Sequence, residues 1–429
     1  MERYGKYKDS GVEWIGEIPV GWEVKKLSRT VEKLTNGYVG PTRGIMQPEG
    51  VPYIQGIHIK NNTIRFTPNG NYYVSQKWSD AHEKSILKMN DLLVVQTGTI
   101  GDVGIVPIEF EGTNCHALLI VRANKSVFYP KYFLFLLISP YGYASLQQIK
   151  TGEILFHING SKLKGIDVLV PPLNDQTAIA NYLDRKTAEI DELITQKERL
   201  LELYEEEKNA IINQAVTKGV DPDVKLKDSG IDWLGEIPAG WEVKRFKYLF
   251  DLITDKTEND LPKIGLENIE SESGTLIQTD TEFEGDGVRF KPGDILFGKL
   301  RPYLAKVYLS DFQGKAVGDF FVFRSQDEIY GKFGAKLILS KRFIEITNGS
   351  TFGSKMPRVS WNFISNLEIA YPTISEQLSI VHHIESETVR INAKIIKTKR
   401  IIELQKEYRT ALISEVVTGK IKVTQEAAS

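Results

Sequence analysis

Side chains that could bind nucleic acid gather in a few short segments of this sequence. Arg, Lys, Asn, Gln, Ser and Thr side chains read base edges, whereas Lys, Arg and backbone N–H groups hold phosphates. In the first half the candidates are Thr35, Asn36, Gly37, Tyr38, Arg43, Lys60, Asn61, Asn62, Gln96, Thr97, Thr99, His157, Asn159, Ser161 and Lys162. In the second half they are Lys299, Arg301, Tyr303, Ser354, Lys355, Arg358 and Ser360. For any single residue in this set, the ordinary explanation, a solvated loop residue, is at least as good as DNA binding. The prediction therefore rests on the clusters and not on their individual members.

Catalytic and metal-binding patterns are missing from the sequence. The histidines and the single cysteine, Cys115, show no metal-ligand spacing, and the adjacent pair His382-His383 would point apart on a helix. No G-x-x-x-x-G-K-[ST] phosphate loop is present, nor is the Asn-Pro-Pro-aromatic motif of amino-group methylation. The glycines from Gly98 to Gly104 are typical of a tight turn. We therefore expect a chain without catalytic residues, metal ligands or a cofactor of its own.

Composition places the chain among soluble globular proteins. Its 429 residues suffice for two or three domains, and 41% hydrophobic with 26% charged residues excludes wholesale disorder. One cysteine allows no internal disulfide, which fits a reducing compartment. The sequence shows neither a signal peptide nor an apolar run long enough to span a bilayer. We therefore expect a cytoplasmic protein that has no membrane partner.

The charge distribution is uneven along the chain. The formal net charge is −2, but residues 1–170 contain 19 basic and 15 acidic residues (+4), and residues 221–371 contain 20 and 24 (−4). A protein that binds DNA alone usually has a basic face. If this chain binds DNA, local clusters or partner subunits must supply much of the phosphate contact.

Two segments of the sequence occur twice. The phrase KDSGVEWIGEIPVGW at Lys8–Trp22 returns as KDSGIDWLGEIPAGW at Lys227–Trp241, and two segments of about 50 residues, 171–220 and 372–420, align without a gap. Each of these longer segments has an apolar ladder with steps of four and seven residues, which marks one stripe of a helix. Asn174 and Ser375 suit the N-cap, and Gly219 and Gly419 suit a left-handed C-cap.

These repeats predict a pseudo-two-fold molecule. Each helix would run about 45 residues, or ~65 Å, and its natural partner is its own copy in an antiparallel coiled coil. The intervening bodies, about 23–170 and 242–371, are rich in Gly, aromatic and β-branched residues, which favours short strands and turns with a few helices such as Pro130 to Gln148. The bodies match only at scattered points: Asp91-Leu-Leu faces Asp294-Ile-Leu, and Gly112 to Arg122 faces Gly314 to Arg324.

We therefore predict an α+β protein with two β-rich, mixed α/β domains separated by two long helices. The domains are residues 1–170, helix 171–220, residues 221–371, helix 372–420 and a tail at 421–429. The tryptophans of the repeated phrase, Trp14, Trp22, Trp233 and Trp241, either anchor the helix ends or fill each body's own core.

The chain resembles the specificity subunits of type I restriction–modification enzymes. The resemblance rests on the duplicated GEIPxGWE phrase, on GDILFGKLRPYL from Gly293 to Leu304, and on the proline and Gln before each long helix. It extends over almost the full length, in the same order and in duplicate. The first copy departs from the family pattern in one place, because it has Asp175-Gln176 where the family usually has Glu-Gln. The second copy keeps the usual pair, as Glu376-Gln377.

The resemblance implies an adaptor without chemistry of its own. Two target-recognition domains would each read half of a split sequence in double-stranded DNA, with the helices as a ruler. Two methyltransferase subunits using S-adenosylmethionine and two restriction subunits using ATP and Mg²⁺ would supply the chemistry. Because the loops of the bodies differ, we expect an asymmetric target. The alternatives are a two-module scaffold that binds other proteins, and a self-contained DNA methyltransferase or nuclease.

Overall fold

The computed structural model describes residues 2–12, 15–67, 72–152, 157–258, 260–281, 283–353 and 355–423. The chain divides into two compact units, one made of Met1–Gln196 with Ile401–Ser429 and the other of Lys197–Arg400. This division passes through the middle of both long helices, so each unit contains one body and half of each helix. Among the described residues, no helix has both the length and the apolar character that crossing a membrane requires.

The two long helices are continuous, as predicted. Helix α5 spans Leu173–Lys218 and helix α9 spans Ile374–Val417. The predicted N-caps were wrong by two residues, because the helices begin at Leu173 and Ile374, ahead of Asn174 and Ser375. In α9 it is Thr373 whose hydroxyl accepts from the Glu376 amide, at 3.4 Å. Both helices end at a left-handed glycine, Gly219 with φ +77° and Gly419 with φ +74°, so the predicted C-caps are confirmed.

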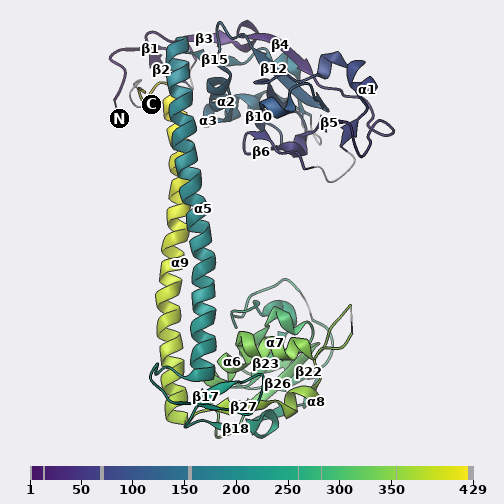
Figure 1. Ribbon diagram of the computed structural model, residues 1–429, viewed down its shortest axis with the longest axis vertical. Coiled ribbons are helices and arrows are strands. Elements are labelled where there is room, and N and C mark those ends of the chain that lie inside the picture. Colours follow the sequence, from purple (N-terminus) through teal and green to yellow (C-terminus); the bar gives the residue numbers. More distant parts are fainter. Residues whose placement is uncertain are drawn as a thin grey trace. The chain divides into compact units, whose positions relative to one another are not determined.

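Within each unit the two helices lie side by side and run antiparallel (Figure 1). In the first unit Arg409 Nε lies 2.8 Å from Asp191 Oδ1. In the second unit Arg390 pairs with Glu207 at 2.9 Å, and the Lys394 ammonium lies 5.3 Å from the centre of the Tyr204 ring. Across these three pairs, a higher residue number on α5 goes with a lower residue number on α9, as antiparallel helices require. The predicted stripe is largely buried, with Ile179, Leu183, Ile380, Ile384 and Ile391 fully covered.

The first body is built on a six-stranded sheet. Its strand order is β4 (Val31–Asn36), β12 (Leu118–Ala123), β9 (Leu92–Val95), β10 (Val103–Ile105), β7 (Thr63–Ile64) and β6 (Ile59–Lys60). A second sheet has the order β11 (Asn114–Cys115), β5 (Val51–Ile54) and β8 (Tyr73–Val74). Residues 96–102 connect β9 to β10 in an antiparallel pair, so the glycines do lie in a hairpin connection, but at seven residues it is longer than the predicted tight turn.

The second body repeats the centre of that sheet. Its order β19 (Phe250–Ile253), β26 (Phe320–Ser325), β23 (Ile295–Gly298) and β24 (Val307–Leu309) corresponds to β4, β12, β9 and β10. A separate sheet has the order β20 (Lys256–Thr257), β22 (Gly287–Phe290), β25 (Gly314–Ala316) and β21 (Lys263–Ile264). The scattered sequence matches therefore do mark core strands of one fold.

Helices cover the sheets in both bodies. The single helix predicted at Pro130–Gln148 is wrong, because the chain forms α2 (Pro130–Ile138) and α3 (Pro140–Gln148). Pro140 lacks an N–H to continue the first helix, and the Ser139 hydroxyl caps the second by accepting from the Gly142 amide at 3.1 Å. The second body has the same break at Ser340, between α6 (Gly331–Leu339) and α7 (Lys341–Gly349), followed by α8 (Trp361–Asn366).

Each body enters and leaves through one antiparallel strand pair. Strand β3 (Glu23–Lys26) pairs with β15 (Asp167–Val170), and β18 (Glu242–Arg245) pairs with β27 (Glu368–Tyr371). The repeated phrase forms the hairpins β1 (Tyr7–Asp9) with β2 (Glu17–Pro19), and β16 (Leu226–Asp228) with β17 (Glu236–Pro238).

The tryptophans of the repeated phrase combine both predicted roles. Trp22 and Trp241 are each 1% exposed, and each ring packs beside the glycine that ends the other copy's helix, Gly419 or Gly219. Trp233 packs partly buried against the second core. Trp14 lies outside the described residues.

Candidate nucleic-acid interface

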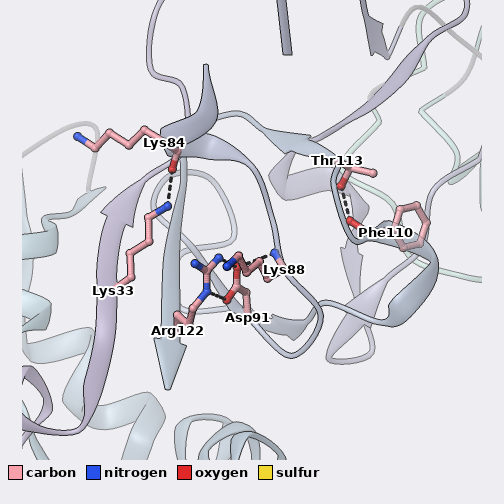
Figure 2. Close-up of polar contacts among 7 residues, drawn as sticks. All are labelled: Lys33, Lys84, Lys88, Asp91, Phe110, Thr113 and Arg122. Carbon is pink, nitrogen blue, oxygen red and sulfur yellow. Dashed lines mark hydrogen bonds and ion pairs between the residues drawn. The ribbon is translucent and has the colours of Figure 1, made fainter. Parts of the chain in front are cut away.

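A buried ion pair recurs at the same position of the sheet in both bodies. The Arg122 guanidinium donates to both carboxylate oxygens of Asp91, at 2.7 and 2.6 Å, and Arg324 does the same to Asp294, at 2.8 and 2.8 Å. Figure 2 shows the first pair. Each carboxylate also accepts a hydrogen bond from the backbone amide three residues earlier in the chain. The protein itself thus supplies the hydrogen-bond donors of both buried carboxylates. The pair joins the residue just before β9 to the neighbouring strand β12, at the end of these strands away from the β9–β10 turn, and the second body repeats this arrangement between β23 and β26.

Strand register places three predicted clusters of the first body at one end of its sheet. Asn36 is opposite Leu119, Leu119 is opposite Val94, and Val94 is opposite Val103. Parallel pairing of β10 with β7, Ile105 to Thr63, sets the Asn61 turn at the level of Val103. The segments containing Thr35-Asn36, Gln96-Thr97-Thr99 and Lys60-Asn61 therefore end together, and Thr97 and Thr99 are exposed.

The fourth cluster, residues 157–162, lies beside this end. Strand β14 (His157–Ile158) pairs with β13 (Lys150–Thr151), and its Ile158 amide donates to the Gln96 carbonyl at 3.1 Å. Helix α4 (Gly160–Leu163) is capped by Asn159, whose Oδ1 accepts from the Ser161 amide at 2.8 Å. Lys162 on this short helix is exposed. Helix α4 packs against β4, which brings the cluster next to Asn36.

A hollow of about 600 Å³ opens beside β4 and is lined by Asn36, Gly37, Tyr38 and residues 80–85. The Tyr38 ring meets Trp78 and His82 edge-on, with centroids 5.0 and 5.1 Å away, while His82 stacks on Trp78 at 3.9 Å. Sequence reasoning missed the contribution of Trp78 and His82. Among the described residues, no hydrogen bond or ion pair ties the exposed Arg43 to this cluster.

In the second body, three predicted cations converge at the equivalent end of the sheet. Lys299 directly follows β23, the counterpart of β9. Arg358 donates to both oxygens of Asp319, at 3.2 and 2.8 Å, and Lys299 Nζ lies 3.9 Å from the same carboxylate. The Arg301 amide donates to the Pro357 carbonyl at 2.8 Å, and Arg301 has a left-handed backbone with φ +50°. The loop after β23 is thus tied to the segment around residue 358 in a strained conformation.

The other predicted residues of the second body are placed differently. Tyr303 lines a cavity of about 340 Å³ with Asn213 of α5 and Lys341 of α7. Ser360 caps α8 by accepting from the Phe363 amide at 3.2 Å. Lys355 is exposed, and Ser354 lies outside the described residues. Asp319, which sequence reasoning missed, falls within the segment Gly314 to Arg324, where a carboxylate just before a buried strand was the available signal.

Comparisons with known proteins agree with this architecture. Residues 19–203 match the family model described as the type I restriction modification DNA specificity domain. The chain is 22% identical over 95% of its length to the type I restriction enzyme MjaVIII specificity subunit of Methanocaldococcus jannaschii, 94% of which is covered. Over nearly its full length the chain is thus similar to specificity subunits of type I restriction enzymes, and residues 19–203 match the DNA specificity domain of those enzymes.

Solved structures share the fold of this chain. The HsdS subunit from Thermoanaerobacter tengcongensis has a TM-score of 0.55 at 15% identity, with 94% of this chain and 98% of that chain covered. A chain solved in work on complex assembly and conformational transition of a type I R-M system has a TM-score of 0.68 at 14% identity, covering 94% and 99%.

Proposed function

We propose that the two bodies of this specificity subunit each read one half of a split, asymmetric DNA sequence for a type I restriction–modification complex. The observation that carries the proposal is the use of one sheet end for two unlike sets of side chains. The first body presents Asn36, Thr97, Thr99 and the 157–162 cluster there, and the second presents Lys299, Arg301 and Arg358. Amides, hydroxyls and cations read different base edges, so the half-sequences should differ.

The long helices set the gap between the half-sites in this proposal. Helix α5 has 46 residues and α9 has 44, and each contributes residues to both units. The repeated phrases and helices dock two methyltransferase subunits, which bring S-adenosylmethionine, and two restriction subunits, which use ATP and Mg²⁺. This chain contributes the choice of sequence and holds no cofactor itself.

Methylome sequencing of a host that carries this chain with its cognate methyltransferase tests the proposal. The expected result is methylation within a bipartite site whose two halves differ and are separated by a gap of constant length. A palindromic target would contradict the asymmetry.

Salt dependence of DNA binding by the assembled complex separates DNA reading from a protein-binding scaffold. DNA reading predicts a steep negative slope of log affinity against log salt. If the complex showed no affinity for DNA, or an affinity for DNA that did not change with salt concentration, the protein-binding scaffold would be favoured instead.

A further inference from the structure

Three lysines of the first body lie around the buried Asp91–Arg122 pair (Figure 2). Lys33 is on β4, Lys84 is in the short 3₁₀ helix Glu83–Ser85, and Lys88 comes just before β9. The Lys33 ammonium donates to the Lys84 carbonyl at 3.0 Å, which fixes this side chain and leaves it further N–H donors. Lys84 and Lys88 are exposed. We call Lys33, Lys84 and Lys88 the lysine cluster.

Nearby acids leave much of the charge of the lysine cluster uncompensated. Both oxygens of Asp91 are taken by Arg122, and the carboxylates of Glu32 and Glu111 also act on Arg122. Burial lowers the pKa of Lys33, and repulsion by Arg122 and Lys88 lowers it further, although Asp91 acts in the opposite direction. Glu83 stands next to Lys84 in sequence. Cations crowded in this way are stabilised by an added anion.

The lysine cluster is not part of the scaffold that the two bodies share. The ion pair recurs in the second body, but the residue opposite Arg324 across the strands is Asp251, whereas Lys33 stands opposite Arg122. The same structural position thus carries opposite charge. The charge of the surrounding segments differs in the same sense, because residues 1–170 sum to +4 (19 − 15) and residues 221–371 to −4 (20 − 24). A feature confined to one body serves something that only this body does.

The lysine cluster also lies along the strand that leads to the candidate interface. Strand β4 is the edge strand of its sheet, and Lys33 precedes Asn36 by three residues, or about 10 Å of strand. Lys84 lines the hollow that Asn36 also lines. Lys33 and Asn36 point to opposite faces of the sheet because they are an odd number of residues apart, so it is Lys84, beside the same hollow as Asn36, that brings the cluster within reach of a duplex at the interface.

We propose that the lysine cluster contacts the DNA phosphate backbone next to the first half-site. The first body then anchors the duplex and supplies most of the salt-dependent affinity, while the second body contributes mainly base reading. This inference rests on the proposed function, since it assumes that both bodies meet DNA.

The test is the salt dependence of DNA binding by the complex with its methyltransferase subunits. The double variant Lys84→Gln/Lys88→Gln should make the slope of log affinity against log salt shallower by about 1.8, at about 0.9 per lost phosphate contact. Binding to target and unrelated DNA should fall by the same factor, with the target sequence unchanged. The control Lys6→Gln/Lys225→Gln removes the same charge at two exposed positions outside both bodies, both long helices and the repeated phrases, and should leave the slope unchanged.

The variant Asp251→Lys provides an independent arm in the second body. It places a cation at the position equivalent to Lys33 and should steepen the slope by about 0.9, with both half-sequences unchanged. Equal slopes for the unmodified complex and both variants, with specific binding intact, would overturn the inference and leave the proposed function standing. A complex without any sequence-specific DNA binding would overturn both.

Discussion

The two tryptophans that close the repeated phrases differ by one hydrogen bond. The Trp241 indole donates to Glu376 Oε1 at 2.9 Å, whereas the equally buried Trp22 indole Nε1 has no partner among the described atoms. Asp175 stands where Glu376 stands in the second copy, and its side chain is one methylene shorter. The departure noticed in the sequence therefore has a structural consequence, which is a buried donor left unsatisfied.

Asp175→Glu should give the Trp22 indole its missing acceptor. We expect stabilisation of the first unit by ~1 kcal/mol, because a buried N–H gains a partner. Hydrogen exchange of the indole N–H, followed by NMR, should slow. The reverse change, Glu376→Asp, should speed exchange at Trp241, and unchanged exchange at Trp22 in Asp175→Glu would refute the explanation.

Removing Arg122 should be far more costly than removing an exposed cation. The Asp91 side chain is 1% exposed and that of Arg122 is 18% exposed, so Arg122→Met leaves a buried carboxylate without its counter-ion. We expect a loss of about 3–5 kcal/mol, measured by urea denaturation. The double variant Asp91→Asn/Arg122→Met should recover part of this loss, because no charge stays buried. A double variant as unstable as the sum of both single variants would contradict this account.

At the scale of elements, the paired helices are defined by local rules and by mutual packing. Their apolar stripe recurs at helical spacing, and their ends carry left-handed glycines. Cross-helix pairs such as Asp191–Arg409 and Glu207–Arg390 are exposed and contribute little energy, but they report the antiparallel register. Packing of the stripe, rather than these ion pairs, holds the helices together.

Lengthening both helices tests their proposed role as a ruler. Four residues, about one turn or ~6 Å, would be inserted into α5 between Leu200 and Glu207 and at the opposite level of α9. We expect a longer gap, by roughly two base pairs at ~3.4 Å each, with both half-sequences unchanged in methylome sequencing. Four residues inserted instead into the connection at 220–223 should leave the gap as it was. A changed half-sequence with a constant gap would rule out the ruler.

At the scale of the whole molecule, each body is a separate insertion on a repeated base. The strand pairs β3–β15 and β18–β27 have the same antiparallel register, Glu23 to Val170 and Glu242 to Tyr371. All the elements that differ between the bodies lie between these paired strands. The boundary between the common scaffold and the reading body is therefore a defined hydrogen-bonded ladder.

This boundary allows one body to replace the other. In one graft, a second copy of residues 23–170 replaces residues 242–371. This chain should fold, because an equivalent strand pair closes each body. We expect the target to become palindromic, with the first half-sequence at both ends in inverted orientation, as read by methylome sequencing. The reciprocal graft should give the palindrome of the second half-sequence. An asymmetric target from either graft would show that reading depends on more than the body.

The sequence alone determined the repeats, the two long helices, their ends within two residues and the family resemblance. These features are local, because helical periodicity, capping residues and a repeated phrase are written in consecutive residues. The break at Ser139 was equally local, and the apolar run on both sides of Pro140 concealed it.

Only the tertiary structure decided which polar residues act together. Asn36 meets the 157–162 cluster, Arg358 meets Asp319, and Lys33 meets Lys84 through strand order and register, across separations from 39 to more than a hundred residues. No local signal encodes such neighbours, because a strand's partner is chosen by the packing of the whole sheet. For the same reason, the missing acceptor of Trp22 became visible only once Trp241 and Glu376 were seen in contact.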